Sequence, residues 1–323
     1  MTPLGGAVER QSEAPAAAAA RALSQGVAQG VASADGFIEH SIASFDNTAL
    51  YVREYGARES AAPPLLCLAG YTRNCRDFHD LALRHGKARR VLCPDMRGRG
   101  KSAHDADPRH YAVETAMADL LALLDALRLE KCVVLGTSFG GVLGMALAVL
   151  RPRALAGLIL NDCGPEFDTD GLDAIVEYAA APRPQPDWRA AARHGRELIG
   201  SGWDKDDAAW LKIARQGYSL ASDGLLHVDY DPAIVKPLAA FAAAGKRGKE
   251  AYDMWAIFRA LGDIPTLLLR GALSSVLKEE TARAMIGAKP DLEHVTVPGV
   301  GHAPFLDEPQ AIEAIDGYLA RFG

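Results

Sequence analysis

The sequence contains no long apolar run and no excess of positive charge. No window approaches the roughly 20 consecutive apolar residues that a transmembrane helix needs, so we expect no membrane span. The 323 residues carry a net charge of -6, whereas nucleic acids and anionic membranes bind surfaces on which Lys and Arg are clustered. The composition therefore argues against a nucleic acid or a membrane as a partner.

The common motifs for metals and nucleotide cofactors are also missing. No pair of the five cysteines has C-x-x-C or other metal-ligand spacing, no Walker loop occurs, and no G-x-G-x-x-G follows the first expected strand. We therefore expect no metal and no cofactor. Four of the cysteines lie in or at the ends of apolar, strand-like runs, which favours buried, reduced thiols in a cytoplasmic protein.

The segment 1–36 lacks the positively charged start and the leucine-rich core of a secretory signal. It is rich in Ala, Gly, Ser and Gln instead. We expect it to form a flexible or partly helical N-terminal extension.

From residue 37, short apolar runs alternate with longer helical patterns. The first two runs, 37–45 and 49–56, predict an antiparallel pair. Alternation of strands with helices predicts an α/β fold with a mostly parallel, doubly wound sheet covered on both faces. The buried strands that follow the antiparallel pair are expected at 64–70, 89–95, 131–137 and 155–162.

This alternation is interrupted by a long helical insertion. Residues 164–263 carry helical patterns and no convincing strand, and the alternation resumes with "IPTLLLRG" and ends in a helix from Pro309. We predict a core of residues 37–163 and 264–323, with an inserted helical cap at 164–263. Ligands of open α/β sheets bind at the carboxyl edge of the strands, so we expect the cap to lie over that edge.

The stretch "VVLGTSFGG" places Gly136, Ser138 and Gly140 in a G-x-S-x-G arrangement between a strand and an apolar helix. Glycines on both sides let the chain make a sharp, strained turn that exposes the serine hydroxyl. We therefore expect Ser138 to be a nucleophile. The structural alternative is an ordinary glycine-rich turn between a strand and a helix.

A serine nucleophile needs a base and a site for the developing oxyanion. His302, in the glycine-rich loop "VPGVGHAPF", can reach the edge of the sheet and is the expected base. By itself it would be read as a loop histidine that bonds to the backbone. The N–H groups of Tyr71, after the strand 64–70, and of Phe139, at the start of the helix, are the expected oxyanion donors.

Two further sets of residues are candidates for the substrate pocket. The loop "PDMRGRGKS" at 94–102 places Arg97 and Arg99 where they could bind an anionic substrate, and ion pairs with nearby Asp residues are the structural alternative. Aromatic residues of the cap, including Trp255, are candidates to line an apolar pocket, although most aromatics in a helical insertion pack it onto the core.

With these motifs, the sequence from about residue 37 to its end resembles the α/β-hydrolase fold superfamily. The match comprises the elbow at 136–140, the D-M-R-G-R-G-x-S loop at 95–102 and G-H-x-P at 301–304. Serine at the elbow implies the branch of esterases, lactonases, thioesterases and carbon–carbon bond hydrolases, because dehalogenases and epoxide hydrolases carry aspartate there. One departure is Ala69-Gly70, where the superfamily usually has His-Gly.

The second departure concerns the acid that orients the histidine. In this superfamily the acid usually follows the strand after the cap, but here that loop reads "ALSSVL" and places Ser275 at the usual acid position. Some members carry the acid one strand earlier, where this sequence has Asp162. Asp162 could instead cap the turn into the cap. A third possibility is that the acid is lost, naturally or by substitution at Ser275, and the protein works slowly as a Ser–His pair.

We therefore expect a cytoplasmic serine hydrolase that cleaves a small carboxylic ester through an acyl-serine intermediate. A lactonase or a carbon–carbon bond hydrolase is the rival within enzymes. A catalytically weakened ligand-binding protein on the same fold is the rival from another class. The expected partner is a small-molecule ester, and the oligomeric state stays open, with a homodimer among the options.

Overall fold

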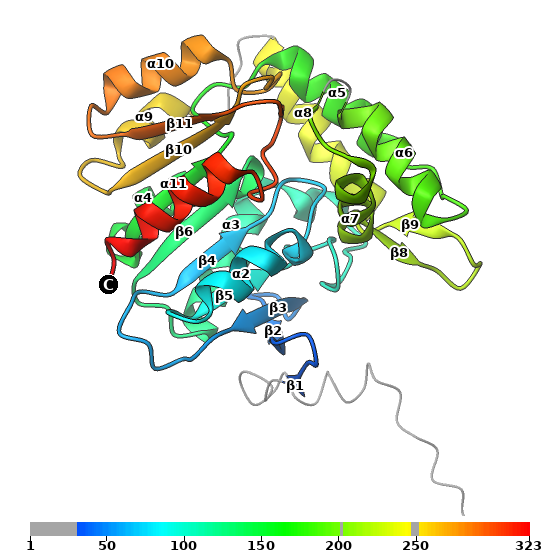
Figure 1. Ribbon diagram of the computed structural model, residues 1–323, viewed down its shortest axis with the longest axis horizontal. Helices are drawn as coiled ribbons and strands as arrows, with labels where there is room; N and C mark the ends of the chain where they lie inside the picture. Colours follow the sequence, from blue (N-terminus) through cyan, green and yellow to red (C-terminus); the bar gives the residue numbers. More distant parts are fainter. Residues whose placement is uncertain (1–30, 201–202, 247–251) are drawn as a thin grey trace, which may run out of the picture.

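Within residues 31–200, 203–246 and 252–323, which the computed structural model describes, nine strands form one sheet (Figure 1). The strand order is β1-β2-β3-β5-β4-β6-β7-β10-β11. The pairs from β1 to β5 are antiparallel and the rest are parallel, which confirms the predicted mostly parallel sheet. The strands are β1 (Val31–Ala32), β2 (Ile38–Ala43), β3 (Ala49–Tyr55), β4 (Leu65–Leu68), β5 (Val91–Pro94), β6 (Cys132–Thr137), β7 (Leu155–Asn161), β10 (Thr266–Gly271) and β11 (Glu293–Val297).

Helices cover both faces of this sheet (Figure 1). The core helices are α2 (His79–His85), α3 (Val113–Ala126), α4 (Phe139–Leu150), α9 (Met254–Arg259), α10 (Glu279–Ala288) and α11 (Pro309–Ala320). Short 3-10 helices are η1 (Cys75–Phe78), η2 (Pro108–Tyr111), η3 (Pro152–Ala154) and η4 (Pro232–Ile234).

The buried strands send alternate side chains to two separate cores. Along β6, Val134 packs in the core beneath α3, α4, α9 and α10, while Val133 and Leu135 pack in the core beneath α2 and α11. Successive side chains of a strand point to opposite faces, so a strand with helices on both sides must be apolar throughout. This explains why the central strands read as unbroken apolar runs.

Between β7 and β10 the chain forms a helical layer that lies together at one end of the molecule (Figure 1). It comprises α5 (Thr169–Ala180), α6 (Trp188–Ile199), α7 (Asp207–Gly217) and α8 (Val235–Lys246). We call these four helices the cap. In contrast to them, α9 packs into the core through Met254 and Phe258.

Two details differ from the expected organisation. A small hairpin of β8 (Tyr218–Leu220) and β9 (Leu226–Val228) lies within 164–263, where no strand was expected. Strands of three residues are too short for an alternating pattern to be recognised. In addition, β1 pairs with β2, so the sheet begins inside the expected extension. The prediction of a flexible or partly helical extension falls mainly on residues 1–30, which lie outside the described residues.

No helix in the described part of the chain combines the length and the apolar character needed to cross a bilayer. All five cysteines are buried and carry free thiols.

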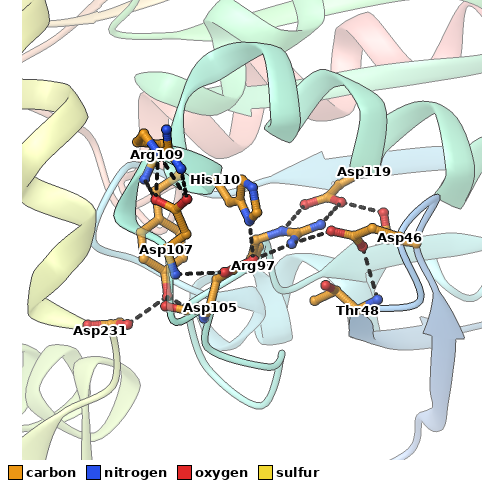
Figure 2. A network of polar contacts seen from close by, with 11 residues as sticks. Asp46, Thr48, Arg97, Asp105, Asp107, Arg109, His110, Asp119 and Asp231 are labelled. Carbon is orange, nitrogen blue, oxygen red and sulfur yellow. Dashed lines mark hydrogen bonds and ion pairs between the residues drawn. The ribbon is translucent and has the colours of Figure 1, made fainter.

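Ion pairs around the buried Arg97 side chain fix the loop that follows β5 (Figure 2). Arg97 is 2% exposed and contacts the carboxylates of Asp119 at 2.8 Å, Asp46 at 2.7 Å and Asp105 at 2.6 Å. Asp46, Asp105 and His110 also place potential metal ligands within 4.8 Å of one another, but the cation that these two carboxylates bind here is Arg97. The cluster therefore ties the loop to α3 and to the turn before β3.

We expect Arg97→Met to destabilise the protein strongly, because it leaves the buried Asp119 carboxylate without its cation. Removal of one partner from a buried ion pair typically lowers the free energy of unfolding by about 3–5 kcal/mol. Urea unfolding at neutral pH measures the loss. Arg109→Met is the matched control, because Arg109 pairs with Asp107 at the surface and its loss should leave the unfolding midpoint unchanged.

The difference between the parent and Arg97→Met should narrow in acid. The hydrogen bond from Arg97 holds the pKa of the Asp46 carboxyl well below its usual range. Folded Asp46 thus takes up its proton at a lower pH than the unfolded chain does. The resulting stability is present above about pH 4 and is lost as the pH falls through the lowered pKa. If the urea midpoints of the parent and Arg97→Met stayed equally far apart as the pH fell below about 4, this explanation would be contradicted.

Candidate active site

Ser138 lies at the sharp turn between β6 and α4. Its φ of 50° and ψ of -112° are strained for a residue with a side chain. The flanking glycines are a steric requirement, because a Cβ on Gly136 would lie 2.3 Å from the carbonyl oxygen of Gly140, and a Cβ on Gly140 would lie 2.1 Å from that of Leu68. The G-x-S-x-G spacing therefore lets a strand and a helix meet closely around the exposed serine.

A continuous hydrogen-bonded chain links Ser138, His302 and Asp162. His302 Nε2 lies 2.9 Å from Ser138 Oγ, and His302 Nδ1 lies 2.7 Å from Asp162 Oδ2. The His302 side chain is 11% exposed and that of Asp162 is fully buried. The three residues come from the loops after β11, β7 and β6, whose carboxyl ends share one edge of the sheet.

The register of β6 and β7 brings Ser138 and Asp162 to the same place. Thr137 pairs with Asn161, and each candidate residue follows directly after its member of that pair. The Ser138 N–H donates to the carbonyl oxygen of Asn161 at 3.0 Å. The Asn161 amide also donates to the carbonyl oxygen of Pro304 at 2.9 Å, which holds the loop that carries His302.

The acid loop after β10 contributes a hydroxyl to Asp162 in place of a carboxylate. Ser274 Oγ donates to Asp162 Oδ2 at 2.5 Å, and the Gly271 N–H donates to Oδ1 at 2.9 Å. With His302, three donors meet this buried carboxylate, as such a group requires. Within the described residues, Ser275, at the usual acid position, makes no hydrogen bond to Asp162.

Asp162 is held in place by a strained and tightly packed backbone. Its φ is 53°, and its N–H donates to the carbonyl oxygen of Leu269 at 2.7 Å. Two residues later the chain is clamped against α10, since a Cβ on Gly164 would lie 2.7 Å from the sulfur of Met285. The carboxylate is therefore fixed at the point where the chain leaves the core.

The backbone N–H groups of Tyr71 and Phe139 have no acceptor within the described residues. Their rings lie edge to face with centroids 5.0 Å apart. Burial raises the pKa of the Tyr71 phenol, whose O–H donates to the carbonyl oxygen of Ile234 at 2.8 Å. Phe139 follows Ser138 directly in the chain, and Tyr71 lines the same cavities as Ser138, so both residues stay candidates for the oxyanion donors.

Arg99 packs against the Tyr71 and Phe139 rings and lines neither of the cavities at Ser138. Its Nε donates to the carbonyl oxygen of Tyr71 at 2.8 Å, and its guanidinium lies 4.7 Å from the Tyr71 ring centroid and 5.7 Å from that of Phe139. Burial lowers the pKa of the Arg99 guanidinium. Arg99 thus packs the two residues that carry the free N–H groups against each other.

Two cavities meet at Ser138. The smaller one, of about 180 Å³, is lined by His302, Arg73 and Trp203 among others. The larger one, of about 330 Å³, is lined by residues of α4, α5 and α8 and is almost entirely apolar. Ser138, Tyr71 and Ile175 line both.

Two of the residues predicted for the substrate pocket, Arg97 and Trp255, line neither cavity. Arg97 is occupied by the ion cluster described above. The Trp255 ring packs on Phe258, and its Nε1 donates to Glu166 at 2.6 Å. The expectation that Arg97 and Trp255 line the substrate pocket is therefore wrong. Arg97 binds carboxylates of the fold, and Trp255 packs on Phe258 and donates to Glu166. Sequence reasoning missed Ser274 and the apolar lining from α4 and α8, since neither carries a motif.

Comparisons with known proteins agree with this architecture. Residues 65–315 match the model of the alpha/beta hydrolase family. A 3-hydroxybutyrate-oligomer hydrolase from Cupriavidus necator is 33% identical over 258 residues, which cover 77% of this chain and 85% of that protein. A 2-hydroxy-6-oxo-2,4-heptadienoate hydrolase from Pseudomonas putida is 42% identical over 92 residues, 28% of this chain and 33% of that protein.

A solved structure of an alpha/beta hydrolase from Novosphingobium aromaticivorans is 42% identical to this chain. It covers 88% of this chain and 98% of its own, with a TM-score of 0.82. The family model and the relative from Cupriavidus necator each span more than two thirds of the sequence. The chain belongs to the alpha/beta hydrolase family.

Proposed function

We propose that the protein is a serine hydrolase that cleaves carboxylic esters through an acyl-serine intermediate. The observation that carries this proposal is the hydrogen-bonded chain from Asp162 through His302 to Ser138. The similarity to an enzyme named for hydrolysis of 3-hydroxybutyrate oligomers, in which the units are joined by ester bonds, supports the ester as the bond that is cleaved.

In the proposed mechanism, each ring nitrogen of His302 has its own role. An ionised carboxylate only accepts hydrogen bonds, so Nδ1 carries the proton that is donated to Asp162, and the lone pair of Nε2 faces Ser138 Oγ. Nε2 removes the serine proton as Oγ attacks the ester carbonyl carbon. Asp162 stabilises the imidazolium that forms and keeps the ring in this tautomer.

The carbonyl oxygen becomes negatively charged as the new C–O bond forms, and it accepts hydrogen bonds from the N–H groups of Tyr71 and Phe139. The bond to the alcohol oxygen then breaks, and that oxygen takes the proton from Nε2. In the second half, His302 removes a proton from water, whose oxygen attacks the acyl carbon. Ser138 Oγ leaves with the proton, and the carboxylic acid is released.

A carbon–carbon bond hydrolase is the second candidate, because of one specific match. 2-Hydroxy-6-oxo-2,4-heptadienoate contains no ester, so the hydrolase named for it breaks another kind of bond. That match covers only 28% of this chain. A lactone is a cyclic ester and falls under the same mechanism as the first proposal. Product analysis by mass spectrometry separates these substrates.

The intact link from Asp162 to Ser138 favours an enzyme over a ligand-binding protein on the same fold, since a receptor has no need of a base on its serine. We propose a cytoplasmic location, which the five buried free thiols support.

We expect Ser138→Ala to lower kcat for p-nitrophenyl esters by a factor of about 10⁴ or more. A fluorophosphonate probe should label the parent at Ser138 and leave this variant unlabelled. The labelled peptide is identified by mass spectrometry. Labelling at another serine would contradict the assigned nucleophile.

Asp162→Asn should lower kcat by about 10⁴, because an amide favours the wrong tautomer of His302 and cannot stabilise its positive charge. Ser275→Asp, which installs a carboxylate at the usual acid position, should not raise the parent rate. Steady-state kinetics on the same esters give both values. A sharp gain in Ser275→Asp with little loss in Asp162→Asn would mean that the acid has been lost and has not moved.

Ser274→Ala should lower kcat about tenfold while KM changes little, since it removes a charge-assisted hydrogen bond to Asp162. The loss should be accompanied by a shifted pH profile of kcat, because the hydroxyl acts on the imidazolium through Asp162. Ser275→Ala is the neighbouring control and should keep most of the parent kcat. Equal losses in both variants, with unchanged pH profiles, would indicate only a damaged loop.

A further inference from the structure

The two cavities at Ser138 differ in whether His302, which carries the serine proton during the proposed reaction, lines them. His302 lines the smaller cavity, of about 180 Å³, and does not line the larger one. Its Nε2, at 2.9 Å from Ser138 Oγ, is the atom that holds the serine proton after attack. The smaller cavity is thus the side from which a leaving group can be protonated.

This asymmetry decides which part of an ester occupies which cavity. The alcohol oxygen must approach His302 Nε2 to take its proton when the C–O bond breaks. The alcohol portion therefore extends into the smaller cavity. The acyl portion leaves the carbonyl carbon in the other direction, beside Phe139 and Val142 in the first turn of α4, and enters the larger cavity.

The larger cavity is built for hydrocarbon. Val142, Phe167, Leu238 and Phe241 are among its apolar lining residues, and no Lys, Arg or His of the described chain lines it. Its one carboxylate, Glu114, accepts a hydrogen bond from the hydroxyl of Tyr252. Apart from Ser138 and the N–H groups of Tyr71 and Phe139 at the reacting end, its described lining residues present no cation that could hold a charged acyl group.

The volume of the larger cavity sets an upper limit on the length of the acyl chain. An apolar cavity of about 150 Å³ binds benzene, a molecule of six carbons, so a cavity of about 330 Å³ admits on the order of twelve. The smaller cavity is less than two thirds as large and contains the Arg73–Asp77 ion pair, which favours a short, polar alcohol.

We propose that the larger cavity is the acyl site and that the protein prefers unbranched aliphatic acyl chains of about six to ten carbons. This inference rests on the proposed ester hydrolysis and names its substrate class. Val142, close to Ser138, and Ala244, on the cap helix α8, limit the length of chain that the cavity accepts.

The test is kcat/KM for p-nitrophenyl esters with acyl chains of two, four, six, eight and ten carbons, below their aggregation limits. In the parent, each methylene group that the cavity buries should raise kcat/KM about fourfold up to the optimum. Val142→Phe should move the optimum to two or four carbons and lower the eight-carbon value at least about tenfold. Val149→Phe is the matched control on the same helix, because Val149 is half exposed and lines neither cavity.

A second cavity variant and a series of esters with different alcohols test the same assignment independently. Ala244→Phe fills the same cavity from the cap and should also shorten the preferred acyl chain, even if Val142→Phe fails to fold. Leu273→Trp, in the smaller cavity, should alter the preference among octanoate esters of different alcohols while the acyl optimum stays in place.

Two results would overturn the inference and leave the proposed function intact. One is an optimum at two carbons in the parent. The other is a change in alcohol preference, in place of acyl preference, in Val142→Phe and Ala244→Phe. Failure of the folded parent to hydrolyse any ester of the series would instead refute the proposed function itself.

Discussion

The pairing of Thr137 with Asn161 across β6 and β7 is the contact on which the rest of the site depends. It sets two strand ends level at one edge of the sheet, so the next residue of each strand, Ser138 and Asp162, faces the same space. His302 then needs only to bridge them from the loop after β11. A shift of one residue in this register would send one of these two side chains toward the opposite face of the sheet from the other.

The surroundings of the site explain how this arrangement is kept rigid. Ser138 and Asp162 both have positive φ values, a conformation that persists only where neighbouring contacts enforce it. Glycines beside the elbow, the N–H groups of the sheet and the Ser274 hydroxyl supply those contacts. The Arg97 cluster stiffens the adjacent loop, which carries Arg99 to its place behind Tyr71.

Much of this could be predicted from the sequence, because the relevant signals are local. Apolar runs and glycines at fixed spacing indicated the parallel sheet and the turn at Ser138, and the loop around His302 was recognisable by its position after the last strand. The choice between Asp162 and a lost acid could not be made locally. It depends on β7 and β10 being neighbours, a contact between residues more than 100 positions apart. Likewise, the residues around Arg97 in the sequence do not indicate whether its guanidinium pairs with carboxylates of the protein or with a carboxylate of a ligand.

The position of Asp162 at the end of β7 also affects where the cap can pivot. The segment that leads to the cap leaves the core directly after Asp162, and the first cap helix, α5, begins at Thr169, so a displacement of the cap would act on the backbone of Asp162. The packing of Gly164 against Met285 anchors the chain at that point. Any movement of the cap must therefore pivot beyond Gly164, and the hydrogen bonds that join Asp162, His302 and Ser138 lie on the other side of that anchor.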